Sequence, residues 1–156
     1  MEGTIKHLRV ELDGLAQQVS SLQSSRENAS AKTSFQLSKM MLGKVLAELG
    51  TANPYPESKD PNSQKIEPTA DVAPSQEVSQ FEETYVSKVK RIRSVADSVC
   101  QRLKRLTVDA HPTLDTRENQ ILYAIFVTEA FVEAEKGMMW LGMELGRIRE
   151  MEEATK

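Results

Sequence analysis

The side chains with the clearest chemical potential in this sequence are cations and aromatic rings. A ligand with phosphates and flat bases needs Arg or Lys for its anions, aromatic or guanidinium faces for stacking, and polar groups for base edges. The residues that could supply these contacts are Arg26, Lys39, Tyr55, Arg91, Arg102, Lys104, Arg117, Asn119 and Trp140, with Arg93, Tyr85 and Tyr123 as further options. The alternative for the cations of residues 81–106 is a solvated helix face that pairs with the acidic fourth helix.

Signatures of catalysis and metal binding are lacking. His7 and His111 lie in different regions, and no Cys, His or Asp spacing suits zinc. Cys100 is the only cysteine and falls on an apolar helix side, which indicates a buried structural thiol rather than a nucleophile. The sequence has no phosphate-binding Gly-rich loop and no G-x-S-x-G motif. The glutamates of the last helical segment are interpreted as a solvated face: Glu129, Glu133 and Glu144. We therefore expect a non-enzymatic protein with no cofactor and no metal.

Composition limits the partners and the compartment. The 156 residues are 39% hydrophobic and carry a formal net charge of −3, and the acidic balance disfavours binding to a nucleic acid polymer. The basic residues concentrate in 81–111, between acidic segments 51–80 and 112–156. No run approaches the roughly 18 apolar residues of a membrane span, and the first residues do not resemble a signal peptide. With a single cysteine, we expect a cytoplasmic protein that does not bind membranes.

Two helices are predicted in residues 1–50. Apolar residues spaced 3, 4, 3, 4 and 3 apart predict a helix that packs on another helix: Ile5, Leu8, Leu12, Leu15, Val19 and Leu22. A second helix is expected over 31–49, with Phe35, Leu42, Val45 and Leu49 on one face, and Gly50 is placed to end it. The polar run 24–28 is either a turn or a solvated stretch of one long helix. A turn near Ser25 would give a helical hairpin.

Two more helices are predicted after residue 80. The third covers 81–106, with an apolar face formed by Phe81, Tyr85, Val89, Ile92, Val95, Val99 and Leu103. His111-Pro112 ends it, and Asp115 or Thr116 can cap the fourth helix, over 117–151. One apolar seam of the fourth helix is read as Ile121, Ala124, Phe131, Met138, Leu141, Leu145 and Ile148, and a second as Ile125, Val132 and Met139. Such a wide apolar arc implies burial on more than one side.

Five of the six prolines lie between Gly50 and Gln80, so no long helix crosses this region. It is either a flexible linker or, given Tyr55 and Ile66, a segment ordered across a surface. The predicted organisation is all-α: an N-terminal helical hairpin over 1–50, a Pro-rich linker over 51–80 and a C-terminal helical hairpin over 81–156, assembled as an oligomeric helical bundle. The apolar surface exceeds what one chain of this size can bury, so a homo-oligomer is expected.

An internal repeat relates the two hairpins. A shift of 99 positions aligns residues 39–49 (KMMLGKVLAEL) with 138–148 (MMWLGMELGRI), and four of eleven positions are identical. An Arg-Glu-Asn triplet occurs near the second helix of each hairpin, at 26–28 and 117–119, but at a different offset. Glycine inside a helix costs roughly 1 kcal/mol relative to alanine, so Gly43, Gly137, Gly142 and Gly146 need a reason. That reason is either close helix crossing or close approach of a flat ligand.

The stretches KMMLG and MMWLG, each near the end of a second hairpin helix, resemble the phage cyclic-nucleotide sponges that counter CBASS and Thoeris immunity. The resemblance implies a compact helical oligomer that sequesters a cyclic di- or trinucleotide, or a cyclic ADP-ribose-type signal, without cleaving it, in the host cell cytoplasm. This chain departs from the family by carrying two hairpins rather than one. The alternative is a helical oligomeric phage structural or adaptor protein with no small-molecule ligand.

Overall fold

The computed structural model describes residues 2–50, 83–108, 114 and 116–156, and the Pro-rich segment lies outside them. The described residues form four α-helices and no strand: α1 (Glu2–Ser20), α2 (Arg26–Glu48), α3 (Tyr85–Val108) and α4 (Arg117–Ala154). The all-helical prediction is confirmed. The second helix begins five residues earlier than expected, at Arg26, because residues 21–25 form a turn.

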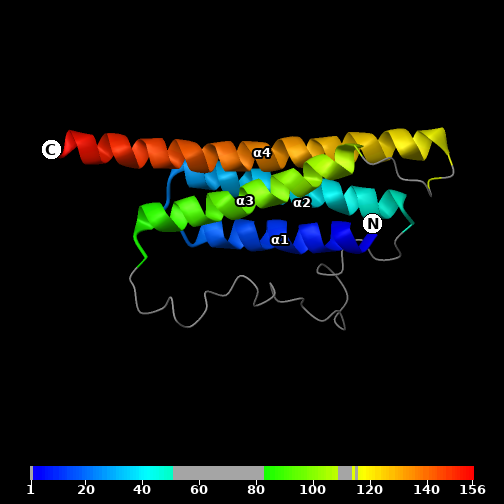
Figure 1. The fold of residues 1–156 in the computed structure, drawn as a ribbon, viewed down its shortest axis with the longest axis horizontal. Helices are drawn as coiled ribbons and strands as arrows, with labels where there is room; N and C mark the ends of the chain where they lie inside the picture. The colour runs from blue at the N-terminus through cyan, green and yellow to red at the C-terminus, as the bar shows by residue number, and fades with distance from the viewer. Residues whose placement is uncertain (1, 51–82, 109–113, 115) are drawn as a thin grey trace.

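The helices form a four-helix bundle (Figure 1). α1 and α2 run antiparallel, α3 runs in the same direction as α2, and α4 returns antiparallel to both. The most extensive contact is between α2 and α4; α1 packs on α2 and α3, and α3 packs on α4. α1 with α2, and α3 with α4, each form an antiparallel pair, and the two pairs pack on each other around one core.

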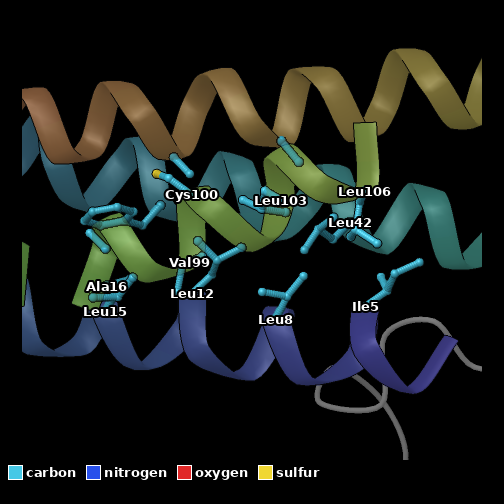
Figure 2. Packing of buried hydrophobic residues seen from close by; sticks show 14 of the residues in the cluster. Ile5, Leu8, Leu12, Leu15, Ala16, Leu42, Val99, Cys100, Leu103 and Leu106 are labelled. Carbon is cyan, nitrogen blue, oxygen red and sulfur yellow. The ribbon is translucent and has the colours of Figure 1, made fainter. Parts of the chain in front are cut away.

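The predicted seam of α1 faces this core. Ile5, Leu8, Leu12, Leu15 and Val19 are at most 2% exposed. Figure 2 shows the α1 side chains pointing toward core residues of α3. The α3 face is also confirmed from Val89 to Leu103, and the 3–4 spacing explains both helices because it keeps each apolar side chain on one stripe.

Local sequence fixes the ends of the second helix of each hairpin. Ser25 caps α2 by accepting a hydrogen bond from the Asn28 amide, and Thr116 caps α4 by accepting one from the Asn119 amide. The two Arg-Glu-Asn triplets are thus the first turns of α2 and α4. Gly50 has φ of 76° directly after α2, the left-handed conformation expected of a residue that ends a helix.

The internal repeat extends through the whole contact between α2 and α4. Adding 99 to six buried α2 positions gives six buried α4 positions: Asn28 and Val127, Ala31 and Ala130, Phe35 and Ala134, Ser38 and Gly137, Leu42 and Leu141, and Val45 and Glu144. Because α2 and α4 are antiparallel, this shared register relates these two helices by an approximate two-fold axis. The offset does not extend to the first helix of each pair, since it places the buried Ile5 and Leu8 at the exposed Lys104 and Thr107, and the duplicated hairpin stays a hypothesis.

The predicted seams of α4 are correct only in part: Phe131, Met138 and Leu145 of the first seam are half-buried and pack against the core, whereas the second seam is exposed. Its buried face consists of Tyr123, Val127, Ala130, Ala134, Gly137, Leu141 and Glu144, and only Leu141 belonged to either expected seam. Ile121, Ile125, Val132 and Met139 are instead 41–51% exposed. The physical reason is the close approach of α2 at the middle of the contact, where the buried residues of α4 are the small Ala130, Ala134 and Gly137. Ser38 Oγ donates to the Ala130 carbonyl at 2.7 Å, and a Cβ on Gly137 would lie 2.5 Å from Phe35 Cε1.

This contact predicts opposite effects of alanine at two glycines of α4. In Gly137→Ala, the new methyl group overlaps the fully buried Phe35 ring, and we expect the free energy of unfolding to fall by about 1–2 kcal/mol despite the better helix propensity. In Gly146→Ala, a Cβ meets no atom within 4 Å, and we expect a gain of up to about 1 kcal/mol. Urea denaturation followed by circular dichroism measures both. Equal effects of the two changes would contradict the proposed packing role of Gly137.

Candidate functional site

A buried polar cluster joins three helices at one end of the bundle. Glu144 on α4 is 0% exposed, and its carboxylate accepts hydrogen bonds from Ser25 Oγ (3.0 Å), Tyr85 Oη (2.8 Å) and Asn28 Nδ2 (3.3 Å). Arg147 donates to both carboxylate oxygens, at 2.8 and 2.7 Å. The expectation that Glu144 lies on a solvated face is wrong, because these four donors replace its hydration.

The surroundings of this cluster hold Glu144 in its charged form. Hydrogen bonds from the Arg147 guanidinium lower the pKa of Glu144 below the ordinary 4.5, and those from Tyr85 and Ser25 act in the same direction against the effect of burial. Burial and the hydrogen bond to Glu144 raise the pKa of Tyr85. The carboxylate of Glu144 is fully satisfied by these donors, and within the cluster only Asn28 Oδ1 is buried without a hydrogen-bond partner. We assign the cluster a structural role: it anchors the start of α2 and the start of α3 to α4.

Two of the sequence-predicted site residues meet near this cluster. The Arg26 guanidinium at the start of α2 lies 6.0 Å from the centre of the Trp140 ring on α4. This is the outer limit of a cation–π contact. Arg26 is exposed and Trp140 is half-buried, so the pair lies at the surface. Tyr85, a stacking option, instead donates its hydroxyl proton to Glu144, and Tyr123 is buried.

Other predicted cations make ion pairs elsewhere. Arg102 on α3 contacts Glu11 on α1 at 2.6 Å, and Lys39 on α2 contacts Asp13 on α1 at 2.8 Å. These pairs join helices across the bundle surface. Arg91 contacts Glu83, which precedes α3, at 3.0 Å. Arg91 and Arg102 of α3 therefore pair with the residues before α3 and with α1, whereas the alternative interpretation had the basic residues of this helix pairing with the acidic fourth helix.

The remaining predicted residues do not converge either. Arg117 and Asn119 lie in the first turn of α4, and the Asn119 amide is used to cap the helix. Arg117 and Trp140 are separated by about 35 Å along α4, so they cannot line one pocket of a single chain. Lys104 is exposed near the end of α3. Tyr55 lies outside the described residues.

A groove between α3 and α4 brings together cations that the sequence did not single out as a group. It has a volume of about 590 Å³ and is lined by Lys90, Arg93, Ser94, Asp97, Met138, Leu145 and Arg149. Within the part of the chain that the structure describes, Lys90, Arg93 and Arg149 make no ion pair. Three cations and one carboxylate among these lining residues give the groove a local excess of positive charge.

A second hollow, of about 710 Å³, continues the groove along α4. Arg93 and Met138 line both, and the second also includes Val132, Glu135, Lys136, Met139, Gly142 and Met143. A Cβ on Gly142 would lie 3.4 Å from Arg93 Nε, so the guanidinium lies beside the α4 backbone at this position. The walls combine cationic groups with the polarizable side chains of three methionines. Such a surface can hold a phosphate-bearing ligand with flat apolar faces.

Sequence reasoning missed Lys90 and Arg149 as members of a site, although it included Arg93 among the cations. The 3–4 spacing of Lys90, Arg93 and Asp97 places them on one edge of α3. Arg149, however, is far away in the chain and lies near them only because α3 and α4 are antiparallel. Cys100 is buried as predicted, and burial raises the pKa of its thiol to about 12.

The fold and the groove define a four-helix bundle with a cationic groove along one helix pair. Comparisons with protein-family models, with curated proteins and with solved structures find no match. None of the described helices is long and apolar enough to cross a membrane. Within the described ranges, no group of three or more His, Cys, Asp or Glu side chains could hold a metal ion.

The buried carboxylate predicts a pH-dependent stability effect. In Glu144→Gln, Arg147 loses its buried counter-charge, and we expect the free energy of unfolding to fall by about 2–3 kcal/mol at pH 7. Because the folded-state pKa of Glu144 is lowered, its stabilisation is present above pH 4.5 and is lost as the pH falls through the folded value. The difference between wild type and variant should therefore shrink in acid.

Denaturation curves at several pH values between neutral and acidic measure this effect. The exposed Glu152→Gln is the matched control, with an expected change within about 0.5 kcal/mol. A difference between wild type and Glu144→Gln that stays constant into acid would show that the charge of Glu144 does not stabilise the fold.

Proposed function

We propose that this protein sequesters a cyclic oligonucleotide or a cyclic ADP-ribose-type messenger, without cleaving it, in the groove between α3 and α4. The resemblance to phage sponges supports this class of ligand, and with it a role in countering host anti-phage signalling. The phosphates would lie against Lys90, Arg93 and Arg149, and the bases against the methionine side chains of α4.

One observation carries the proposal. The MMWLG stretch that resembles the sponges forms a wall of the groove through Met138, Met139 and Gly142, directly beside Arg93. The residues of the resemblance and the cations were identified independently, one from the sequence and the other from the packing of α3 on α4. Their meeting in one groove supports a binding surface over a simple packing contact.

The chemistry of the groove favours binding rather than catalysis. Arginine and lysine form charge-assisted hydrogen bonds with phosphate oxygens, and these contacts hold an anion without activating a nucleophile. Asp97 is the one carboxylate among the described residues that line the first part of the groove, and it can accept a hydrogen bond from a base or a ribose hydroxyl. We therefore expect the ligand to be bound and later released without being cleaved.

The test is a thermal-shift and calorimetry screen against cyclic di- and trinucleotides and cyclic ADP-ribose isomers. A ligand at 100 times its dissociation constant stabilises the folded state by about 2.7 kcal/mol, which raises Tm by several degrees. We expect Arg93→Glu combined with Arg149→Glu to weaken binding by about 100-fold, because two phosphate contacts become repulsive.

Lys104→Glu is the matched control, since Lys104 is an exposed cation of the same helix outside the groove. Intact nucleotide recovered after heat denaturation would support sequestration. If binding occurs but is lost in Lys104→Glu and not in the groove variant, the groove assignment is wrong. If none of these ligands binds, the function itself is wrong.

A helical oligomeric adaptor without a small ligand is the second candidate. The observation that favours it is the row of exposed apolar side chains on α4, which includes Ile121, Ile125 and Met139. Self-association without any nucleotide-dependent shift would support the adaptor over the sponge.

A further inference from the structure

α4 carries a second apolar face. Five large side chains of this helix are 41–51% exposed: Ile121, Ile125, Val132, Met139 and Met143. We call them the α4 stripe. At 100° per residue, the other four lie within about 20° of Val132 around the helix axis. The buried residues of α4 centre on the opposite side, so the described helices of one chain do not cover the stripe.

The spacing between the stripe residues is the same when the helix is read in either direction. Its members are separated by 4, 7, 7 and 4 positions, with Val132 at the centre. A stripe with this symmetry matches a reversed copy of itself, as a two-fold symmetric interface requires. Its length of about 33 Å is that of a six-turn helix contact.

We propose that a second copy of this chain covers the α4 stripe, with the two α4 helices antiparallel about a two-fold axis at Val132. Val132 then meets Val132 of the partner subunit. Ile125 meets the partner subunit's Met139, and Ile121 meets the partner subunit's Met143. Isoleucine thus packs against methionine at both ends of the contact, and the unbranched methionine side chain can adapt to the branched one.

The charges beside the stripe fit this arrangement. Glu129 and Lys136 lie on the same flank, about 60° and 40° from Val132. The two-fold axis of an antiparallel helix pair is perpendicular to the plane that contains both helix axes. Residues on one flank of the stripe therefore lie on the same side of that plane in both copies. Along the helix axis, the positions of Glu129 and the partner subunit's Lys136 therefore differ by about one residue. Lys136 also contacts Glu133 of its own helix at 2.8 Å, which holds its side chain on this flank.

A second charged pair follows from the same symmetry. Glu118 lies about 40° from Val132 on that flank, and Arg147 about 60°. In the antiparallel pair, the positions of Glu118 and the partner subunit's Arg147 along the helix axis also differ by about one residue. The opposite flank brings Glu135 beside the partner subunit's Thr128, so no like charges meet there. Both flanks are thus compatible with the pair.

The offset of 99 positions between α2 and α4 allows the outward-facing residues of these two helices to be compared. Subtracting 99 from the stripe positions that fall on α2 gives Arg26, Thr33, Met40 and Lys44, of which three are polar. The core-facing positions of α2 and α4 keep the same register, whereas the outward positions are apolar only on α4. A general need for helix hydrophobicity would affect both helices, so the apolar stripe indicates a contact specific to α4.

This inference does not depend on the proposed ligand. Val132, Met139 and Met143 also border the second hollow, so the partner helix would form an additional wall there. Self-association can nevertheless be measured with no nucleotide present. Failure of the dimer and failure of nucleotide binding are therefore distinguishable.

Cross-linking of the full chain tests the geometry. A short bis-maleimide should join Val132→Cys to itself, because the two copies of position 132 meet at the axis. Met139→Cys should not join to itself, since its copies lie about 21 Å apart along the pair. A mixture of Ile125→Cys and Met139→Cys should cross-link. Thr33→Cys on α2 is the matched control, and the native Cys100 is buried and does not compete.

Sedimentation equilibrium with charge variants tests the same arrangement without added cysteines. We expect Glu129→Lys to raise the dimer dissociation constant about 10-fold, because the introduced ammonium group would face the partner subunit's Lys136. Combining it with Lys136→Glu should restore the constant to within about 3-fold of wild type. Folding is checked by circular dichroism.

Three outcomes would overturn the proposal. The first is a wild-type chain that stays monomeric at concentrations well above micromolar, as it would if another segment of the same chain covered the stripe. The second is cross-linking of Met139→Cys to itself, which would indicate a parallel pair. The third is the absence of rescue by the double charge exchange.

Discussion

The close contact between α2 and α4 is the constraint on which the bundle depends. Ser38 donates to a main-chain carbonyl of α4, and the Phe35 ring lies against Gly137, so the two helix backbones approach more closely than large side chains would allow. This approach decides which residues of α4 are buried. At the middle of this contact the small Ala130, Ala134 and Gly137 face the core, and the large side chain of Val132 lies on the outside. The outward apolar stripe is therefore a consequence of how the inside is packed.

Glu144 occupies the position on α4 that Val45 occupies on α2, and both are fully buried. One hairpin thus places an apolar residue, and the other a carboxylate, at equivalent points of a shared register. A buried charge is tolerated only when several donors replace water. Here the donors come from the turn before α2, from the starts of α2 and α3, and from α4 itself. The cluster therefore links α2, α3 and α4 at the end of the bundle where Arg26 and Trp140 also lie.

The cations of the chain divide into two groups by their surroundings. Arg102, Lys39 and Arg91 make ion pairs with carboxylates on neighbouring elements, and these pairs lie at the surface, where each contributes little to stability. Lys90, Arg93 and Arg149 line a groove beside methionine side chains and the backbone at Gly142. The second group is the better candidate for an anionic ligand, because binding there does not require an existing ion pair to break.

The sequence left open whether residues 24–28 form a turn, but by itself it determined the four helices, the buried stripes of α1 and α3, and a cap of α4 at Asp115 or Thr116. These features depend on spacing and on neighbours within a few residues, which a single sequence displays. Only the tertiary structure decided which face of α4 is buried, the role of Glu144 and the membership of Arg149 in a groove. Each of these depends on a helix distant in the chain. Whether a large or charged side chain is buried or exposed depends on how closely that distant helix approaches. The periodicity of one helix does not contain this information.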